Sequence, residues 1–417
     1  MEFPRLMSTS TPFWRSPVVY IAAQLAPFAM LAVAYQTATV KLDAVRFDSV
    51  TLSHLLMMSA VLTPLLSQLF SGPLFRSLQG TEDRSFAMVT ATALRNTPKA
   101  LAIGALPVVI LGAIFSQAFR WGSLPAGVML GTISIHLLFG VTLVPAYARR
   151  RSELLLLGWG GYAVAFSISP QFWWLPSTVG ILLELSVLFA IAGRRLREAR
   201  VTLARDMLAG LVRSFSAAVP LWSIPFGLFL LGRWDIDPER VFAAMIPALL
   251  GYQFFFSAVA APMWRRIDYA HRQLSELPAG QAASAIDGLS RRAKMGEARV
   301  VGVLALLVIT SLPLITAANT PANLVSLGTL LASCSAVILI AQLCRLGMLG
   351  QTAPSYAVGG ALLVNMLVCA GFHFDLASFL FLHFGLCAAG TIVVAGANYL
   401  EWRRPEYALF WRRALRQ

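Results

Sequence analysis

The sequence predicts an all-α polytopic membrane protein with about twelve transmembrane helices in two parallel six-helix lobes. Two properties of the composition support this class: 58% of the 417 residues are hydrophobic and only 12% are charged. A soluble domain needs more charge than this to solvate its surface. The third observation is that apolar runs of about 20 residues recur along the chain, each long enough to cross a hydrocarbon core roughly 30 Å thick. Such long runs also exclude a β-barrel, whose short strands alternate apolar with polar residues.

Twelve of these runs are predicted to be transmembrane helices. They cover residues 17–39, 50–72, 100–118, 124–147, 154–171, 174–193, 207–232, 241–262, 299–318, 324–345, 354–372 and 377–399. No cleavable signal peptide is expected, because the first run is longer than the apolar region of a signal peptide and no small-residue cleavage site follows it.

The basic residues predict how these helices are oriented. With the N-terminus in the cytoplasm, the loops on that side and the C-terminal tail hold most of the 33 Lys and Arg residues. The opposite side then has only Lys41, Arg46, Arg120, Arg233 and Arg240. This bias follows the positive-inside rule, so we expect a multi-pass protein of the cytoplasmic (inner) membrane with both termini in the cytoplasm. The net charge of +14 therefore reflects topology, and no binding to nucleic acid is expected.

Two similar stretches indicate that the chain consists of two related halves. GPLFRSLQ at 72–79 ends the second apolar run, and APMWRRIDYAHRQL at 261–274 ends the eighth. Each has a proline, an aromatic residue and arginine in that order, and each precedes a polar loop with an amphipathic pattern. The alternative is that all inner edges of membrane helices resemble one another. Parallel repeats are typical of transporters in which two lobes rock against each other.

The repeat predicts the domain organisation. The N-terminal lobe covers residues 1–193, a basic amphipathic linker on the cytoplasmic side covers 194–206, and the C-terminal lobe covers 207–417. The second lobe includes a cytoplasmic hairpin at 264–298 and an amphipathic tail at 400–417. We expect the linker and the tail to form helices in the inner interface, where arginine side chains reach the lipid headgroups.

Charged side chains inside a bilayer usually mark a functional site or a structural pair. Glu184 lies near the middle of the sixth run, and Arg213 lies one to two turns into the seventh. They are interpreted either as a structural ion pair or as residues of a substrate or coupling pathway. A third interpretation has Arg213 reaching out to the inner interface.

Uncharged and titratable groups in the other runs give further candidates. The histidines His54, His136 and His383 could bind protons and couple transport to them, or could be packing residues with hydrogen bonds. Glutamine amides suit a cavity for sugars, but they also join helices. The predicted substrate-pathway residues are Arg213, Glu184, Gln24, His54, Gln68 and Gln253.

Motifs for catalysis, nucleotide binding and metal binding are missing from the sequence. It contains no P-loop, no HExxH and no Gly-rich fingerprint, so we expect no catalytic residue, no metal and no cofactor. The four cysteines lie in apolar runs without CxxC spacing and are interpreted as packing thiols. Transport would then be driven by an ion gradient, by a partner that pulls the substrate, or by the gradient of the substrate itself.

Three stretches carry a resemblance to a known family. They are GPLFRSLQ, the loop APMWRRIDYAHRQLSELPAGQAASAIDGLSRRAKMG, and the ending NYLEWRRPEYALFWRR. At these places the chain resembles the PelG family, inner-membrane proteins proposed to export the Pel exopolysaccharide of biofilms, within the MOP superfamily of polysaccharide flippases. The opening MEFPRLMSTSTPFWRS departs from the Gly-rich opening of that family, which leaves the particular polymer open.

The resemblance implies a flippase-like fold in a bacterial inner membrane, with two six-helix lobes and a central cavity. It also implies a polysaccharide or lipid-linked sugar as substrate. A cytoplasmic glycosyltransferase and other membrane subunits would be partners, besides the membrane lipids.

Two other functions stay open at this point. One is a small-solute secondary transporter, although the long loops here follow the second and eighth runs rather than the sixth. The other is a membrane-embedded glycosyltransferase or polymerase that uses Asp43 or Asp48 in the first outer loop. Such enzymes usually carry a large external domain, whereas all the predicted outer loops of this chain are short.

Overall fold

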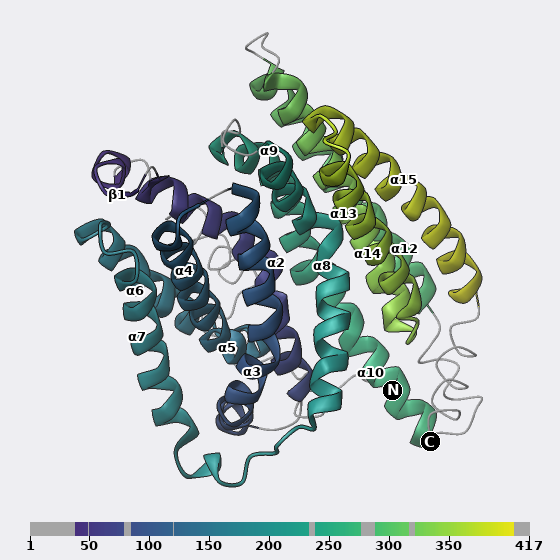
Figure 1. Ribbon diagram of the computed structural model, residues 1–417. Coiled ribbons are helices and arrows are strands. Elements are labelled where there is room, and N and C mark those ends of the chain that lie inside the picture. The colour runs from purple at the N-terminus through teal and green to yellow at the C-terminus, as the bar shows by residue number, and fades with distance from the viewer. Residues whose placement is uncertain are drawn as a thin grey trace. The chain divides into compact units, whose positions relative to one another are not determined.

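The described residues of the computed structural model are 38–48, 50–78, 85–119, 121–232, 238–276, 288–316 and 322–403. Nearly all of them are helical (Figure 1), and among them ten helical segments are long and apolar enough to cross a membrane. The predicted all-α polytopic membrane class is thereby confirmed. The predicted first span at 17–39 lies outside the described residues except for its last two.

The helices follow the remaining predicted spans, with shifted ends. They are α2 (Leu52–Ser77), α3 (Phe86–Phe119), α4 (Ser123–Thr142), α5 (Val144–Arg149), α6 (Ser152–Ile168), α7 (Leu175–Ala192), α8 (Ala204–Gly232), α9 (Pro238–Phe254), α10 (Ala261–Glu276), α12 (Leu289–Thr316), α13 (Ala322–Met348), α14 (Ala353–Gly371) and α15 (Leu376–Glu401). Two short strands, β1 (Arg46–Phe47) and β2 (Val50–Thr51), pair antiparallel before α2.

Proline explains one of the shifted ends. The predicted span 154–171 ends early, since α6 stops at Ile168 and Ser169 has an extended φ of −139°. Pro170 follows, and the residue before a proline avoids the helical region because of a steric clash. With 17 residues, α6 is apolar but shorter than the ten described segments that are long enough to cross a membrane.

The chain divides into two compact units. The first contains residues 1–63, 70–116 and 120–210, and the second contains residues 64–69, 117–119 and 211–417. The middle of α2 thus belongs with the second unit. The predicted division into lobes at 193 and 207 stays a prediction.

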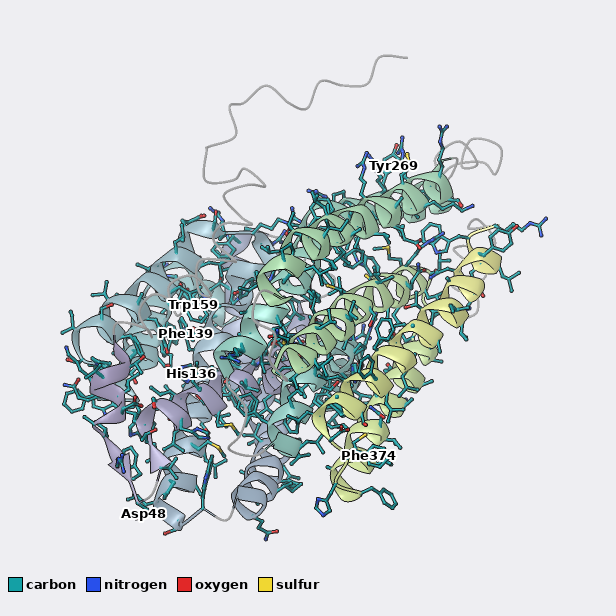
Figure 2. All side chains as sticks on the ribbon, turned by 90° about the horizontal axis from the view of Figure 1, so that it is seen from above. Asp48, His136, Phe139, Trp159, Tyr269 and Phe374 are labelled. Carbon is teal, nitrogen blue, oxygen red and sulfur yellow. The ribbon has the colours of Figure 1, made fainter. Side chains whose placement is uncertain are left out.

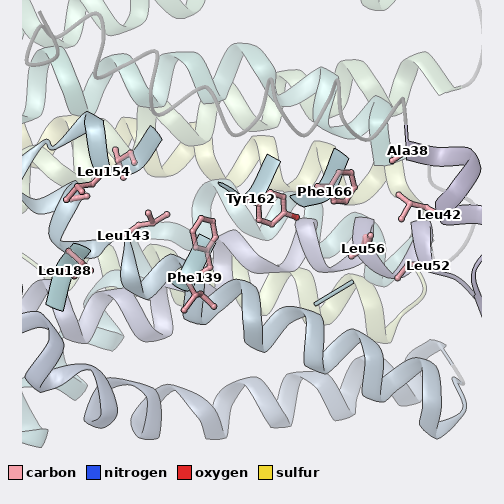
Figure 3. Packing of buried hydrophobic residues seen from close by; sticks show 13 residues of the cluster. Ala38, Leu42, Leu52, Leu56, Phe139, Leu143, Leu154, Tyr162, Phe166 and Leu188 are labelled. Atoms are coloured by element: carbon pink, nitrogen blue, oxygen red, sulfur yellow. The ribbon is translucent and has the colours of Figure 1, made fainter. Parts of the chain in front are cut away.

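The core of the first unit lies where α4, α6 and α7 pack together (Figure 3). Phe139 of α4 and Leu143, the C-cap residue of α4, lie one turn apart on a buried face, and Tyr162 and Phe166 of α6 do the same. A Cβ atom placed on Gly180 of α7 would lie 2.7 Å from Cε2 of Phe139. Glycine therefore permits the close approach of α7, as small residues do between membrane helices.

The second unit is arranged around α13, which contacts α9, α12 and α15. The most apolar part of α13 is largely buried, whereas those of α14 and α15 are mostly exposed. Helix α8 contains Pro220 and Pro225. His383 of α15 is fully buried, and its Nε2 lies 2.9 Å from the carbonyl oxygen of Pro220.

The expected helix over the linker is not present. Residues 193–196 form a short 3-10 helix (η2, Gly193–Leu196), residues 200–203 are not helical, and α8 begins at Ala204. The physical reason is that side chains of α3 bind the linker backbone, as described below. In the predicted hairpin at 264–298, α10 continues to Glu276 and α12 begins at Leu289. Most of the predicted tail lies outside the described residues.

Candidate functional site

Buried and half-buried polar side chains gather in the first unit between α4, α6 and α7. They are Glu184 and Ser177 of α7, Trp159 and Tyr162 of α6, and His136 of α4. Figure 2 shows His136, Phe139 and Trp159 in this region, and Figure 3 shows Tyr162 beside Phe139. We call these five polar residues the first-unit cluster.

Glu184 lies on the buried face of α7, at helical spacing from Ser177, Ile181 and Leu188. Its side chain is fully buried, and neither carboxylate oxygen has a hydrogen-bond partner among the described residues. It lies against α6, because a Cβ atom placed on Gly158 would be 2.9 Å from Oε1 of Glu184. Glycine at 158 is thus what leaves room for the carboxyl group.

An ionised carboxylate in this place would be costly. Moving an unpaired charge out of water costs several kcal/mol or more, so buried charges in proteins are paired, neutralised or bound to a metal. The arrangement therefore requires a proton or a cation at Glu184, or a second conformation that supplies a partner.

His136 and Tyr162 form the polar contact of the cluster. Nε2 of His136 lies 3.0 Å from the Tyr162 hydroxyl, and Nδ1 lies 2.8 Å from the carbonyl oxygen of Thr132. A carbonyl oxygen can only accept, so Nδ1 donates to it. In the neutral imidazole Nε2 then accepts from the tyrosine hydroxyl. The pair consists of neutral hydrogen-bonding groups in an apolar surrounding.

Aromatic rings hold this pair in position. The ring of Phe139 stacks on Tyr162 with centroids 5.9 Å apart, and Trp159 meets Phe139 edge-on at 4.9 Å. Nε1 of Trp159 and Oγ of Ser177 are buried without a hydrogen-bond partner among the described residues. The cluster therefore holds unsatisfied donors and acceptors besides Glu184.

Only part of this cluster could be found in the sequence. Glu184 was predicted as a pathway residue, and His136 as a histidine that could titrate. Ser177, Trp159 and Tyr162 were not predicted from the sequence. A signal existed on α7, where Ser177 precedes Glu184 by two turns and so lies on the same face. No signal showed that α6 would supply the tyrosine.

The other predicted pathway residues lie elsewhere. His54 is half-buried in the first turn of α2, where its backbone N–H donates to Oγ1 of Thr51 at 3.4 Å. Gln68 accepts a hydrogen bond of 2.7 Å from the hydroxyl of Ser214 in the second unit. Gln253 is half-buried near the end of α9. Gln24 lies outside the described residues.

Arg213 belongs to the second unit and lies on the side of α8 that faces α13. Its Nη2 would be 3.8 Å from a Cβ atom placed on Gly347. Glu184 belongs to the first unit, so the expected pair of Glu184 and Arg213 stays a prediction.

The second unit has a polar network that was not predicted from the sequence. Nη1 of Arg345 in α13 lies 2.6 Å from Oε2 of Glu297 in α12, and Gln342 donates to the other oxygen of that carboxylate. Asn398 of α15 donates to the backbone and side-chain oxygens of Gln342 at 2.9 and 2.8 Å. The Arg345 guanidinium also lies over the ring of Trp402, 5.2 Å from its centroid. This network joins the N-terminal part of α12 to the C-terminal ends of α13 and α15.

The described residues contain no group of three His, Cys, Asp or Glu side chains that could hold a metal ion. Cys334, Cys344, Cys369 and Cys387 are free thiols, and Cys344 is the least buried of them.

Comparison with known proteins gives likenesses in structure alone. No protein-family model matches the chain, and no curated protein matches it. The chain is similar to a crystal structure of MATE in complex with MaL6, with 16% identity over 95% of this chain and 98% of the other, and a TM-score of 0.45. It is also similar to a MOP superfamily transporter from Pyrococcus furiosus, with 16% identity, coverage of 96% and 99%, and a TM-score of 0.49.

A third similar structure is the outward-facing conformation of a multidrug resistance MATE family transporter of the MOP superfamily. The identity is 14%, the coverage is 96% of this chain and 99% of the other, and the TM-score is 0.44. The membrane-helix class of this protein rests on its own helices.

Proposed function

We propose that the protein is a transporter of the bacterial inner membrane that exports or flips a polysaccharide or a lipid-linked saccharide, by alternating access or as a conduit. The observation that carries the proposal is Glu184, an acidic side chain buried among apolar helices with no partner in the described residues. Ionisable groups at membrane depth are costly and usually belong to substrate or ion pathways. No enzymatic activity is part of the proposal.

A saccharide substrate is supported by the resemblance of three stretches to the PelG family. It also agrees with the kind of polar groups found within the membrane helices. The His136–Tyr162 pair and the Ser214–Gln68 pair are neutral donors and acceptors, the groups that recognise sugar hydroxyls. A cytoplasmic glycosyltransferase would supply the chain that is exported.

Deletion of the gene under conditions that induce polysaccharide production tests this proposal. We expect surface polysaccharide to be lost and polymer or lipid-linked sugar to accumulate inside the cells. Expression of the wild-type chain should restore export. Unchanged surface polysaccharide in the deletion strain would overturn the saccharide proposal.

A small-solute secondary transporter is the second candidate, because Glu184 suits coupling to a proton or another cation. It predicts gradient-driven movement of a small solute into proteoliposomes that contain the purified protein. It also predicts normal surface polysaccharide in the deletion strain, so the same deletion distinguishes the two candidates.

The glycosyltransferase alternative depends on Asp43 and Asp48. Asp43 accepts a hydrogen bond from Ser53, whose hydroxyl lies 2.9 Å from that of Thr51, the N-cap residue of α2. Asp48 has a φ of +54° in the turn between β1 and β2. The hydrogen bond to Ser53 gives the Asp43 carboxylate a structural role at the start of α2, and this favours the transporter.

A further inference from the structure

The linker between α7 and α8 is bound along its backbone by side chains of α3, all within the first unit. Nη1 of Arg95 donates to three backbone carbonyl oxygens of the linker. Its acceptors are the carbonyl oxygens of Leu196, Arg197 and Ala199, at 3.3, 2.6 and 3.0 Å. One guanidinium thus fixes the course of the chain where η2 ends.

Two further residues of α3 continue this binding. Asn96 is fully buried, and its amide donates to the carbonyl oxygen of Arg200 at 2.9 Å and accepts from the backbone N–H of Thr202 at 2.9 Å. Nζ of Lys99 lies 2.8 Å from the carbonyl oxygen of Thr202. The backbone of residues 196–202 is therefore held against α3, and Ala199 and Thr202 are buried beneath it.

This binding leaves the remaining linker side chains on the outside. Arg194, Arg197, Arg200 and Arg205 are exposed. The apolar residues Val201 and Leu203 are exposed between them, by 49% and 71%. Residues 193–205 contain five arginines and one glutamate. We call the exposed residues at 194, 197, 200, 201, 203 and 205 the linker surface.

We propose that the linker surface binds the headgroups of anionic phospholipids. The span that contains α7 ends at Leu196 and the span of α8 begins at Ala204, so the linker lies at the membrane end of two adjacent spans. Lipid phosphates are found at that depth, and arginine binds phosphate with two parallel hydrogen bonds. Exposed valine and leucine beside the arginines suit the boundary between headgroups and acyl chains.

A soluble acidic protein fits the linker surface less well. It would have to cover Leu203, which directly precedes the first turn of a membrane span and so lies at the expected depth of lipid headgroups. Glu198, also exposed, lowers the charge near the middle of the linker and leaves arginines on both sides of it.

The test uses the full-length protein, delipidated in detergent and titrated with phosphatidylglycerol or phosphatidylcholine, with bound lipid counted by native mass spectrometry. We expect phosphatidylglycerol to be retained preferentially. The variant R194Q/R197Q/R200Q/R205Q should lose this retention by about fivefold or more. The matched control R265Q/R266Q/R291Q/R292Q removes the same charge from exposed arginines of the second unit and should lose less than about half of it.

A second variant tests whether lipid retention depends on the conformation of the linker as well as on its net charge. Asn96→Ala leaves every linker arginine in place but releases the backbone, so phosphatidylglycerol retention should fall by about threefold, and the linker should become sensitive to trypsin. Asn365→Ala on α14 serves as the control. A monodisperse size-exclusion peak shows that each variant is folded. If Asn96→Ala does not fold, the four-arginine variant alone decides the proposal.

Three results would overturn the proposal. They are equal lipid loss in the two four-arginine variants, unchanged retention in the linker variant, and displacement of phosphatidylglycerol by an equal concentration of inorganic phosphate. The last would assign the surface to a soluble anion. Loss of binding to an acidic protein from the same cells, with lipid retention unchanged, would assign it to a protein partner. None of these results depends on transport, so they are independent of the proposed function.

Discussion

Glu184 is expected to be needed for transport but to contribute little to the stability of the fold. Replacing it with glutamine keeps the shape of the side chain but removes the proton-binding group. Because the carboxylate has no partner in the described residues, we expect a free energy of unfolding within about 1 kcal/mol of the wild type. Transport should nevertheless fall by about tenfold or more, since coupling through a proton or cation is lost. Thermal unfolding in detergent and polysaccharide export in the complemented deletion strain measure the two effects.

Glu153→Gln is the matched control for this substitution. Glu153 is 42% exposed in its side chain and pairs with Arg151 at 2.9 Å, and exposed pairs contribute little to stability. Both stability and transport should stay close to the wild type. A strongly destabilised Glu184→Gln protein would instead show that the carboxylate has a structural partner, and the pathway role would be abandoned.

At the scale of single residues, the sequence predicted the unusual side chain but not its surroundings. Glu184 could be found because a charge within an apolar run is rare. Its neighbour Gly158 comes from a different helix, α6. Which faces of α4, α6 and α7 meet depends on packing, and the apolar runs are hydrophobic all round, so they carry little information about the faces.

At the scale of elements, the ion pair between Glu297 of α12 and Arg345 of α13 should contribute to stability as a coupled unit. The side chain of Arg345 is 10% exposed and that of Glu297 is 30% exposed. Removing one partner leaves a charge that is largely buried, so Glu297→Ala should lower the free energy of unfolding by about 2–3 kcal/mol. The double variant Glu297→Ala/Arg345→Met should lose less than the sum of the two single variants. Chemical unfolding of the four proteins in detergent measures this; additive losses would mean that the pair has no coupling.

The first turn of α15 gives a prediction about pH. Asp375 is the N-cap residue, and the hydroxyl and the backbone N–H of Ser378 hold the pKa of its carboxyl below the usual value. A lowered pKa in the folded state means that the stabilisation is present at neutral pH and is lost as pH falls through the folded-state value. Asp375→Ala should therefore lower the melting temperature at pH 7, and the difference from the wild type should shrink toward pH 3. A constant difference at both pH values would contradict this assignment; Ser378→Ala, which keeps the backbone N–H, should show a smaller effect.

The elements also show why helix ends are hard to predict. The eighth run was expected to end at 262, but the chain continues as a helix from α9 through residues 255–260 and α10 to Glu276. Residues 255–260 form a π-helix (η3, Phe255–Ala260) that ends two residues before Pro262. A proline removes one backbone hydrogen bond and its ring meets the preceding turn, and a wider π turn accommodates this without ending the helix. Sequence patterns place the proline but do not show which solution the chain adopts.

At the scale of the whole molecule, the helical membrane class was predictable because hydrocarbon requires long helices with internal hydrogen bonds. The polar contacts between helices were not. Gln342 and Asn398 are 56 residues apart in sequence and still form two hydrogen bonds. In a membrane protein such contacts are chosen by how the helices pack, which the composition of each run does not determine.

The orientation of the chain in the membrane is the remaining prediction at this scale. The distribution of Lys and Arg places the linker in the cytoplasm and the turn between α14 and α15 outside. Both places have exposed residues, Arg205 at the start of α8 and Phe372, 74% exposed, after α14. In a background in which the four cysteines are replaced by serine or alanine, Phe372→Cys should react with a membrane-impermeant maleimide in spheroplasts. Arg205→Cys should react only after the membrane is permeabilised. The reverse pattern would invert the topology, and it would then move the linker surface and its lipid partners to the outer leaflet.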